Sequence, residues 1–123
     1  MPSQFVTFKI DLDVWERFKR KFSRDKVRYY KKAKQQLKLR TNELIARLLK
    51  KYLTGEMQID TTTPLPTNDC VMRGVSLDSD VWAEATKHLV DLKIEGNGSS
   101  LGELISRVIV CYNSQEGEEC LNF

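Results

Sequence analysis

The chain is 123 residues long, which fits one domain of ordinary size or two very small ones. Its composition, 41% apolar and 30% charged, is typical of a chain that folds in water, and it has no apolar run long enough for a membrane-spanning helix. The net charge of +3 hides an asymmetry, because residues 1–60 carry 16 Lys and Arg against 7 Asp and Glu, whereas residues 61–123 carry 4 against 10. The first residues lack the basic and apolar segments of a secretory signal, so we expect the three cysteines to be reduced intracellular thiols.

A strand followed by a long helix is predicted at the start of the chain. Apolar and polar residues alternate from residue 5 to residue 10, as they do in a half-buried strand. One face of this strand carries Val6, Phe8 and Ile10. The opposite face carries Phe5, Thr7 and Lys9. Asp11 is then suited to cap a helix that we expect to continue to about residue 36, with residues 23–25 as the place for a kink.

The first helix runs through a strongly basic segment. Residues 17–40 contain twelve Lys and Arg and a single acid, Asp25. Such a segment favours contact with a polyanion, most simply a nucleic acid, although a solvated helix face is the simpler alternative. A second helix is predicted around residues 43–49, starting near Arg40 or Thr41, and a Thr- and Pro-rich linker follows it.

The second part of the chain repeats this pattern. DSDVWAE at residues 78–84 matches DLDVWER at residues 11–17. ELISRVI at residues 103–109 likewise matches ELIARLL at residues 43–49. Each of the latter segments has Glu and Arg four positions apart, the spacing of an ion pair along a helix. We therefore expect two copies of the order strand, helix, helix.

The second predicted strand, at residues 72–77, is less regular than the first. Its apolar side carries Val75 and Leu77. Its other side carries Met72, Gly74 and Ser76. Arg73 has the parity of the apolar side, so we expect a bulge near Gly74 that turns Arg73 outward.

Two helices are predicted after this strand. Asp78 is suited to cap the first of them, which should end at the Gly-rich residues 96–98. Ser100 stands three positions before Glu, as in a capping box, at the start of the second. Trp15 and Trp82 hold equivalent places in the two copies, and we expect both to be buried core anchors.

In this order the elements resemble the ribbon-helix-helix family of DNA-binding proteins, of the Arc and MetJ repressor kind. The resemblance rests on FKIDLDVW with TNELIARLL, and on VSLDSDVW with SSLGELISRV. It implies a mainly α (α+β) fold of two tandem ribbon-helix-helix copies, with a two-stranded antiparallel ribbon over a four-helix core. We place the first copy at residues 1–53 with a basic insertion at about 23–40, the linker at 54–69, the second copy at 70–113 and a tail at 114–123. We favour a single-chain pseudo-dimer, the alternative being that each copy pairs with the same copy of a second chain.

The family places its ribbon in the major groove of DNA, so the resemblance implies that outward strand residues read bases. These residues are Phe5, Thr7 and Lys9 of the first strand and Met72, Arg73, Gly74 and Ser76 of the second. Lys9 suits guanine acceptors, Thr7 suits several bases, and Phe5 fits a thymine methyl group. The second strand offers fewer hydrogen-bonding side chains, so we expect a non-palindromic core site read chiefly by the first copy.

The resemblance also implies phosphate contacts at the start of each second helix, because helix N-termini favour anions. The corresponding positions are Arg40, Thr41, Asn42, Ser99 and Ser100. The basic segment would add phosphate contacts that supply affinity but little specificity. Its members are Arg24, Lys26, Arg28, Lys31, Lys32, Lys34 and Lys38.

The implied function is sequence-specific binding of double-stranded DNA, most simply as a transcriptional repressor or regulator. We expect it in the cytoplasm, and we expect the protein to be of bacterial, archaeal, viral or plasmid origin. Tandem copies are also similar to relaxosome accessory proteins of conjugative plasmids, and related dimers act in partition. An alternative from a different functional class is a protein-interaction module with a degenerate DNA-binding fold, in which the basic segment binds an acidic protein. The sequence shows no nucleophile–base pair, metal-ligand set or Gly-rich phosphate loop, so we expect no enzyme activity, metal, cofactor or small-molecule ligand. Self-association on DNA is compatible with ribbons that read short sites.

Overall fold

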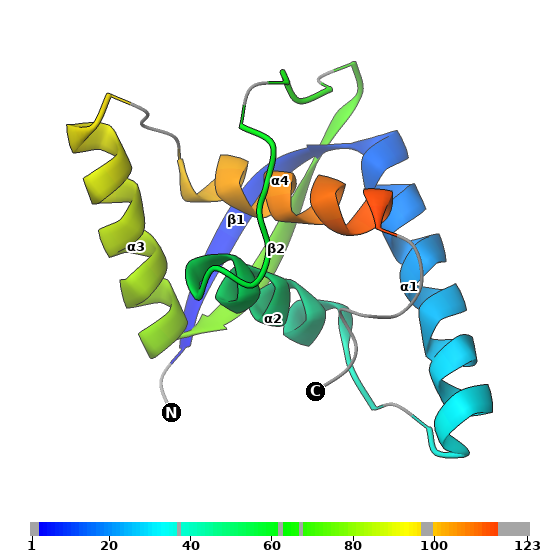
Figure 1. Ribbon diagram of the computed structural model, residues 1–123. Helices are drawn as coiled ribbons and strands as arrows, with labels where there is room; N and C mark the ends of the chain where they lie inside the picture. Colours follow the sequence, from blue (N-terminus) through cyan, green and yellow to red (C-terminus); the bar gives the residue numbers. More distant parts are fainter. Residues whose placement is uncertain (1–2, 37, 62, 67, 97–99, 116–123) are drawn as a thin grey trace.

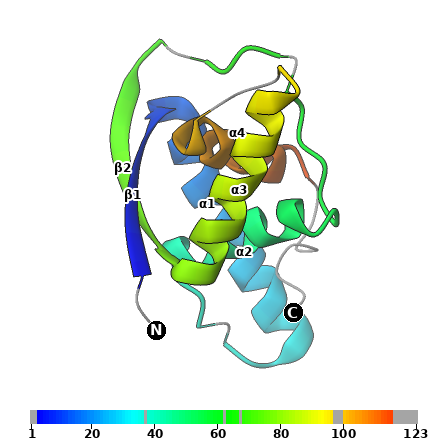
Figure 2. The ribbon, with the colours of Figure 1, turned by 90° about the vertical axis from the view of Figure 1, so that its left-hand side faces the viewer.

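The computed structural model describes residues 3–36, 38–61, 63–66, 68–96 and 100–115. The elements follow one another as β1 (Ser3–Asp11), α1 (Leu12–Ala33), α2 (Thr41–Leu53), β2 (Cys70–Asp78), α3 (Ser79–Ile94) and α4 (Leu101–Ser114). The strands form a two-stranded antiparallel ribbon, and the helices gather on one side of it (Figures 1 and 2). None of these helices has the length and apolar character needed to cross a membrane.

The expectation of two tandem ribbon-helix-helix units is wrong. Each half of the chain supplies one strand, and β1 pairs with β2 along its whole length, from Ser3 opposite Asp78 to Asp11 opposite Cys70. A lone strand leaves its backbone N–H and C=O groups without partners, so neither half forms a ribbon of its own. The described residues therefore contain one ribbon with four helices, and the strands pair within one chain.

The ribbon has one covered face and one open face. The covered face is built from Phe8, Ile10, Val75 and Leu77, each at most 4% exposed. On the open face, Phe5 is 70% and Met72 is 53% exposed. Because successive side chains of a strand point to opposite faces, the alternation in the sequence correctly predicted which residues are covered.

Helices α2 and α4 cross the covered face and complete most of the core with it (Figure 1). Their fully buried aliphatic residues are Leu44, Ile45, Leu48 and Leu49 of α2, and Leu104, Ile105, Val108 and Ile109 of α4. Burying each of these side chains favours folding by roughly 1.5–3 kcal/mol. Gly102 lets α4 approach β1 closely, because a Cβ there would lie only 3.3 Å from the Cβ of Phe8. The two matching sequence segments thus mark the two helices that share the core.

The two tryptophans have different environments, although the sequence predicted both to be core anchors. Trp15 is 7% exposed and contacts the ring edge of Phe8, with the guanidinium of Arg73 5.4 Å from its ring centroid. Trp82 is 36% exposed, so its expected burial is wrong. By the offset between the two matching segments, Val75 and its partner Val6 hold the positions that Phe8 and Arg73 hold in the first copy, and they offer neither an aromatic ring nor a cation.

A buried polar cluster joins α1 to α4. Asp25 is 1% exposed and accepts hydrogen bonds at Oδ2 from the Lys21 ammonium at 2.7 Å and from the Tyr112 hydroxyl at 2.6 Å. The Lys21 ammonium also lies 4.0 Å from the centroid of the Tyr112 ring. Helix α1 continues without a break through residues 23–25, where we expected a kink, and this cluster holds that part of it against α4.

The linker between α2 and β2 is attached to α4 by Arg107. The Arg107 guanidinium donates from Nη1 to the backbone oxygens of Asp60 at 2.8 Å and Thr63 at 3.0 Å, and pairs with Glu103 at 3.1 Å. The predicted pair at helical spacing in α4 is therefore present, and it orients the guanidinium toward the linker. Figure 1 shows the linker passing over α4 on its way to β2.

Replacing Arg107 by alanine is expected to release the linker. We expect the free energy of unfolding to fall by about 1–2 kcal/mol, because two carbonyl groups and one carboxylate lose a charged donor. Limited proteolysis should cut the linker faster than in the wild type. Arg107→Lys keeps the charge but not the planar fork, so it should protect the linker only partly. Equal protection in wild type and Arg107→Ala would contradict this role.

Candidate nucleic-acid interface

The open face of the ribbon is the surface from which the sequence predicted base contacts. Phe5, Thr7 and Lys9 of β1 lie on it together with Met72, Gly74 and Ser76 of β2. The register places Phe5 opposite Ser76, Thr7 opposite Gly74, and Lys9 opposite Met72. In Figure 2 this face is turned away from all four helices. The ribbon thus presents three cross-strand pairs side by side on one uncovered surface.

Phe5 and Gly74 form a small apolar contact on this face. A Cβ built on Gly74 would overlap the Phe5 ring, so the ring lies over the bare backbone of β2. This arrangement needs glycine at position 74, and it leaves most of the ring in solvent. Phe5 and Met72 give the open face apolar contact groups, whereas Thr7, Lys9 and Ser76 give it hydrogen-bonding groups.

Arg73 does not lie on the open face, so the predicted bulge and its outward turn are wrong. The register is continuous, with Arg73 opposite Phe8 on the covered side. Its guanidinium lies over the Trp15 ring and donates to the backbone oxygen of Met72 at 2.9 Å. The flat, weakly hydrated guanidinium tolerates this half-buried place beside an aromatic ring, and this removes the need for a bulge.

The starts of α2 and α4 lie near the ribbon and differ in their capping (Figure 2). The hydroxyl of Ser100 accepts a hydrogen bond from the backbone N–H of Glu103 at 3.1 Å, as the predicted capping box requires. Arg40 precedes α2 in an extended conformation and makes no capping hydrogen bond with its side chain. The first N–H groups of α2 therefore lack a side-chain cap and are open to an anion. Ser99, the remaining predicted phosphate contact, lies outside the described residues.

The other predicted phosphate contacts are spread along α1 and the segment after it. Arg24, Lys26, Arg28, Lys31 and Lys32 belong to α1, and Lys34 and Lys38 follow it. Figure 2 shows that α1 starts beside one end of the ribbon and runs obliquely away from it, whereas the chain after α1 returns toward the start of α2. Lys38 and Arg40 are therefore the cations of this set that lie at the start of α2, where Thr41 and Asn42 are the first residues of the helix.

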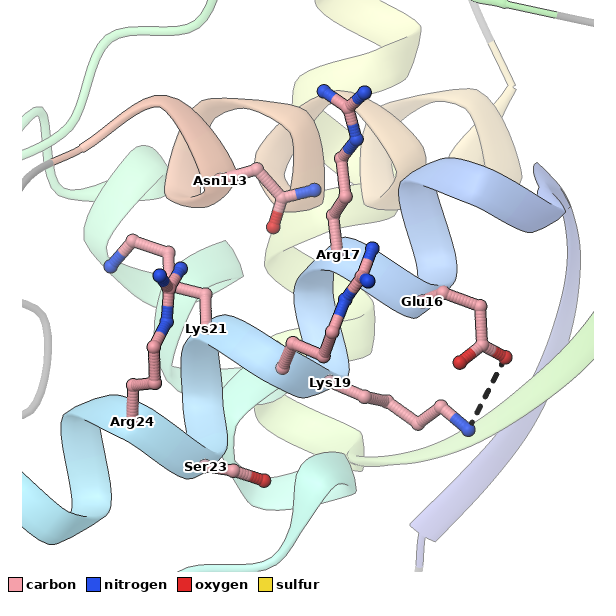
Figure 3. Close-up of a pocket in the computed structure, with 8 residues that line it drawn as sticks. Glu16, Arg17, Lys19, Lys21, Ser23, Arg24 and Asn113 are labelled. Carbon is pink, nitrogen blue, oxygen red and sulfur yellow. Dashed lines mark ion pairs between the residues drawn. The ribbon is translucent and has the colours of Figure 1, made fainter.

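An open hollow of about 820 Å³ lies between α1 and the end of α4. Its lining includes Glu16, Arg17, Lys19, Arg20, Lys21, Ser23, Arg24 and Asn113. Figure 3 shows Arg17 and Arg24 bordering it from α1 and Asn113 from α4, while Lys19 pairs with Glu16 at 3.5 Å. The amide of Asn113 donates to the backbone oxygen of Val14 at 3.1 Å, which holds the two helices together at this point. Arg17 and Arg20 were absent from the predicted contacts, although their helical spacing from Arg24 is visible in the sequence.

The described residues offer little for chemistry beyond binding. No three His, Cys, Asp or Glu side chains among them come together as metal ligands. Tyr52 and His88 join α2 to α3 through a hydrogen bond of 2.7 Å, and burial raises the pKa of the Tyr52 hydroxyl. Burial also raises the pKa of the Cys111 thiol, which keeps it protonated at neutral pH.

Comparison of the chain with protein-family models, with curated proteins and with solved structures found no match. The resemblance to the ribbon-helix-helix family therefore stays a prediction from the sequence.

Proposed function

We propose that the chain binds double-stranded DNA by placing the open face of its ribbon in the major groove. The observation that carries this proposal is a nine-residue, two-stranded ribbon that all four helices leave uncovered on one face. The major groove is wide enough to admit such a ribbon and displays a distinct pattern of donors and acceptors for each base pair. Thr7 and Lys9 lie within this face, where hydrogen-bonding side chains would meet base edges.

The two strands would contribute unequally to base recognition. Lys9 donates to guanine acceptors, and Thr7 and Ser76 either donate or accept. Phe5 and Met72 suit the methyl group of thymine. Because the cross-strand pairs are Phe5–Ser76, Thr7–Gly74 and Lys9–Met72, the two halves of the face differ in chemistry. The preferred core site should therefore be non-palindromic.

The start of α2 would hold a phosphate next to the groove. Its N–H groups lack a side-chain cap, and its dipole favours negative charge. Lys38 and Arg40 add two exposed cations to the same place. At the start of α4, Ser100 already occupies one N–H group, so phosphate binding should be weaker there.

Occupation of a DNA site by such a protein suits a transcriptional repressor. An accessory role in plasmid transfer or partition would use the same contacts. Either use requires access to DNA, which we propose takes place in the cytoplasm.

The exposed apolar groups favour a second candidate, a protein-interaction surface. Phe5 and Met72 are large apolar side chains on the open face, and a partner protein would bury them as readily as thymine methyl groups would. Lys9 on the same face and the N-terminus of α2 without a side-chain cap favour DNA over a partner protein.

Fluorescence anisotropy on duplexes selected from a randomised pool tests the proposal. The wild type should enrich a motif and bind it with an affinity that falls steeply with salt. Thr7→Ala/Lys9→Ala should bind that motif about 30-fold more weakly or worse, because each lost base contact costs roughly 1–3 kcal/mol.

The matched control is Thr86→Ala/Lys87→Ala, which removes the same two residue types from α3. This control should bind the motif as the wild type does. Equal binding by the two double variants would contradict recognition through the ribbon. Absence of DNA binding by the wild type at low salt would favour the protein-interaction surface.

A further inference from the structure

Helix α1 carries a row of cations along its exposed side. Arg17, Arg20, Arg24, Arg28 and Lys31 follow one another at spacings of three and four, so they lie on one stripe about 21 Å long. All five are exposed. Val27 and Tyr30, 54% and 57% exposed, form an apolar strip beside this row. The row and the strip together are called the α1 surface below.

Helix α3 carries the opposite charge in a similar arrangement. Asp80, Glu84 and Asp91, with Glu95 at the C-cap, lie on one exposed stripe about 22 Å long. Lys87 lies in the same stripe, which therefore carries four acids and one base. None of the four carboxylates forms an ion pair with another described residue. Beside this stripe lies an apolar strip that includes Val90 and Ile94, which are 53% and 79% exposed. The stripe and the strip together are called the α3 surface below.

The α3 surface is unusual because its helix buries little of itself. Among the residues of α3 only Ala85 is buried, whereas α1 buries Trp15, Phe18 and Phe22 along with two polar side chains. Exposed apolar side chains that line up along a helix mark a contact surface more often than isolated ones do. A second helix with a matching apolar strip and cations would cover the α3 surface.

The α1 and α3 surfaces cannot meet within one molecule, because the two helices lie on opposite flanks of the fold (Figure 1). We propose that the α3 surface of one copy of this chain docks on the α1 surface of a second copy. The charges are opposite, the stripes have nearly equal length, and each has an apolar strip beside it. This contact joins two different surfaces, so each added copy leaves one of each free and the assembly grows head to tail.

DNA is the competing occupant of the α1 surface. Its cations would attract phosphates, but DNA would leave the acidic α3 surface uncovered and unexplained. Helix α1 also runs away from the ribbon, so its far end lies away from a duplex held on the open face (Figure 2). A second copy accounts for both surfaces with one contact.

Charge reversal tests the proposal without DNA. Sedimentation velocity of the wild type should show an average mass that rises with protein concentration and falls at about 0.5 M salt, where surface charges are screened. Arg20→Glu/Arg24→Glu/Arg28→Glu leaves three acids and two bases in the α1 row, so both surfaces are then acidic. Glu84→Lys/Asp91→Lys leaves three bases, Lys87 included, and two acids in the α3 stripe, so both surfaces are then basic. Each variant alone should associate at least about tenfold more weakly than the wild type, because like charges then face each other.

Mixing the two variants decides the matter. In the mixture every contact joins an acidic surface to a basic one, so association should return. Lys50→Glu/Lys51→Glu, which reverses two charges on α2, should associate as the wild type does, and circular dichroism should show all variants folded. A wild type that stays monomeric, or a mixture of folded variants that fails to associate, would overturn the proposal. So would loss of DNA binding by Arg20→Glu/Arg24→Glu/Arg28→Glu with unchanged self-association.

Discussion

Replacing Asp25 by alanine is expected to lower the free energy of unfolding by about 3–5 kcal/mol, a large share of the stability of a small protein. The Lys21 ammonium would remain in a nearly closed environment, 6% exposed, without the carboxylate that neutralises it. The hydroxyl of Tyr112, which is fully buried, would lose its acceptor as well. Removing one partner of a buried pair leaves the desolvation cost of the other uncompensated.

Thermal and urea unfolding measure this effect. Asp91→Ala is the matched control, since it removes an exposed aspartate of α3 and should change the free energy of unfolding by less than about 0.5 kcal/mol. Replacing the whole cluster by apolar groups, as Lys21→Met/Asp25→Leu/Tyr112→Phe, should restore much of the stability that Asp25→Ala loses. An Asp25→Ala protein as stable as the Asp91→Ala protein would show that the cluster does not hold α1 to α4.

Phe8 and Phe5 separate folding from binding on a single strand. Phe8→Ala should cost about 3–5 kcal/mol, because Phe8 is 2% exposed and its ring packs on Trp15 in the core. Phe5→Ala removes the same side chain from the opposite face, where 70% of the residue is exposed, and should cost at most about 1 kcal/mol. The second change should instead weaken binding to the selected DNA motif.

The comparison needs both readouts on both variants. Urea unfolding gives the stability of each, and anisotropy at a temperature where both are folded gives the affinity. We expect a large stability loss with Phe8→Ala and a selective affinity loss with Phe5→Ala. If Phe5→Ala binds the motif as tightly as the wild type, the aromatic ring has no part in recognition.

The sequence predicted the faces of the strands well, because a period of two residues leaves little ambiguity once one face is apolar. The sequence wrongly predicted the face of Arg73 and the burial of Trp82, because both depend on residues of the opposite strand. Arg73 lies on the covered side with its guanidinium over the Trp15 ring. In the second copy the positions of Phe8 and Arg73 are held by Val75 and Val6, so Trp82 has no equivalent of these two partners. The register of β1 against β2 decides which residues face each other across the ribbon, and the spacing of residues within one strand does not reveal this register.

The burial of Asp25 was likewise hidden from the sequence, where it stands as the single acid among twelve cations. Its partners are Lys21, one turn earlier on the same helix, and Tyr112, which lies 87 positions away. The tandem organisation was also wrongly predicted. Matching sequence segments identify equivalent elements, but they do not show whether each copy completes its own ribbon. Of the candidate interface, the open-face residues and the start of α2 lie where the sequence placed them, whereas the α1 cations lead away from the ribbon.

Titration of the isotope-labelled protein with a duplex carrying its enriched motif is the most direct test of the central claim. Backbone amide shifts should change most on the open face of the ribbon, around Thr7 and Lys9, and at the first residues of α2. Shifts confined to residues 24–32 of α1, or none at all, would contradict recognition through the ribbon.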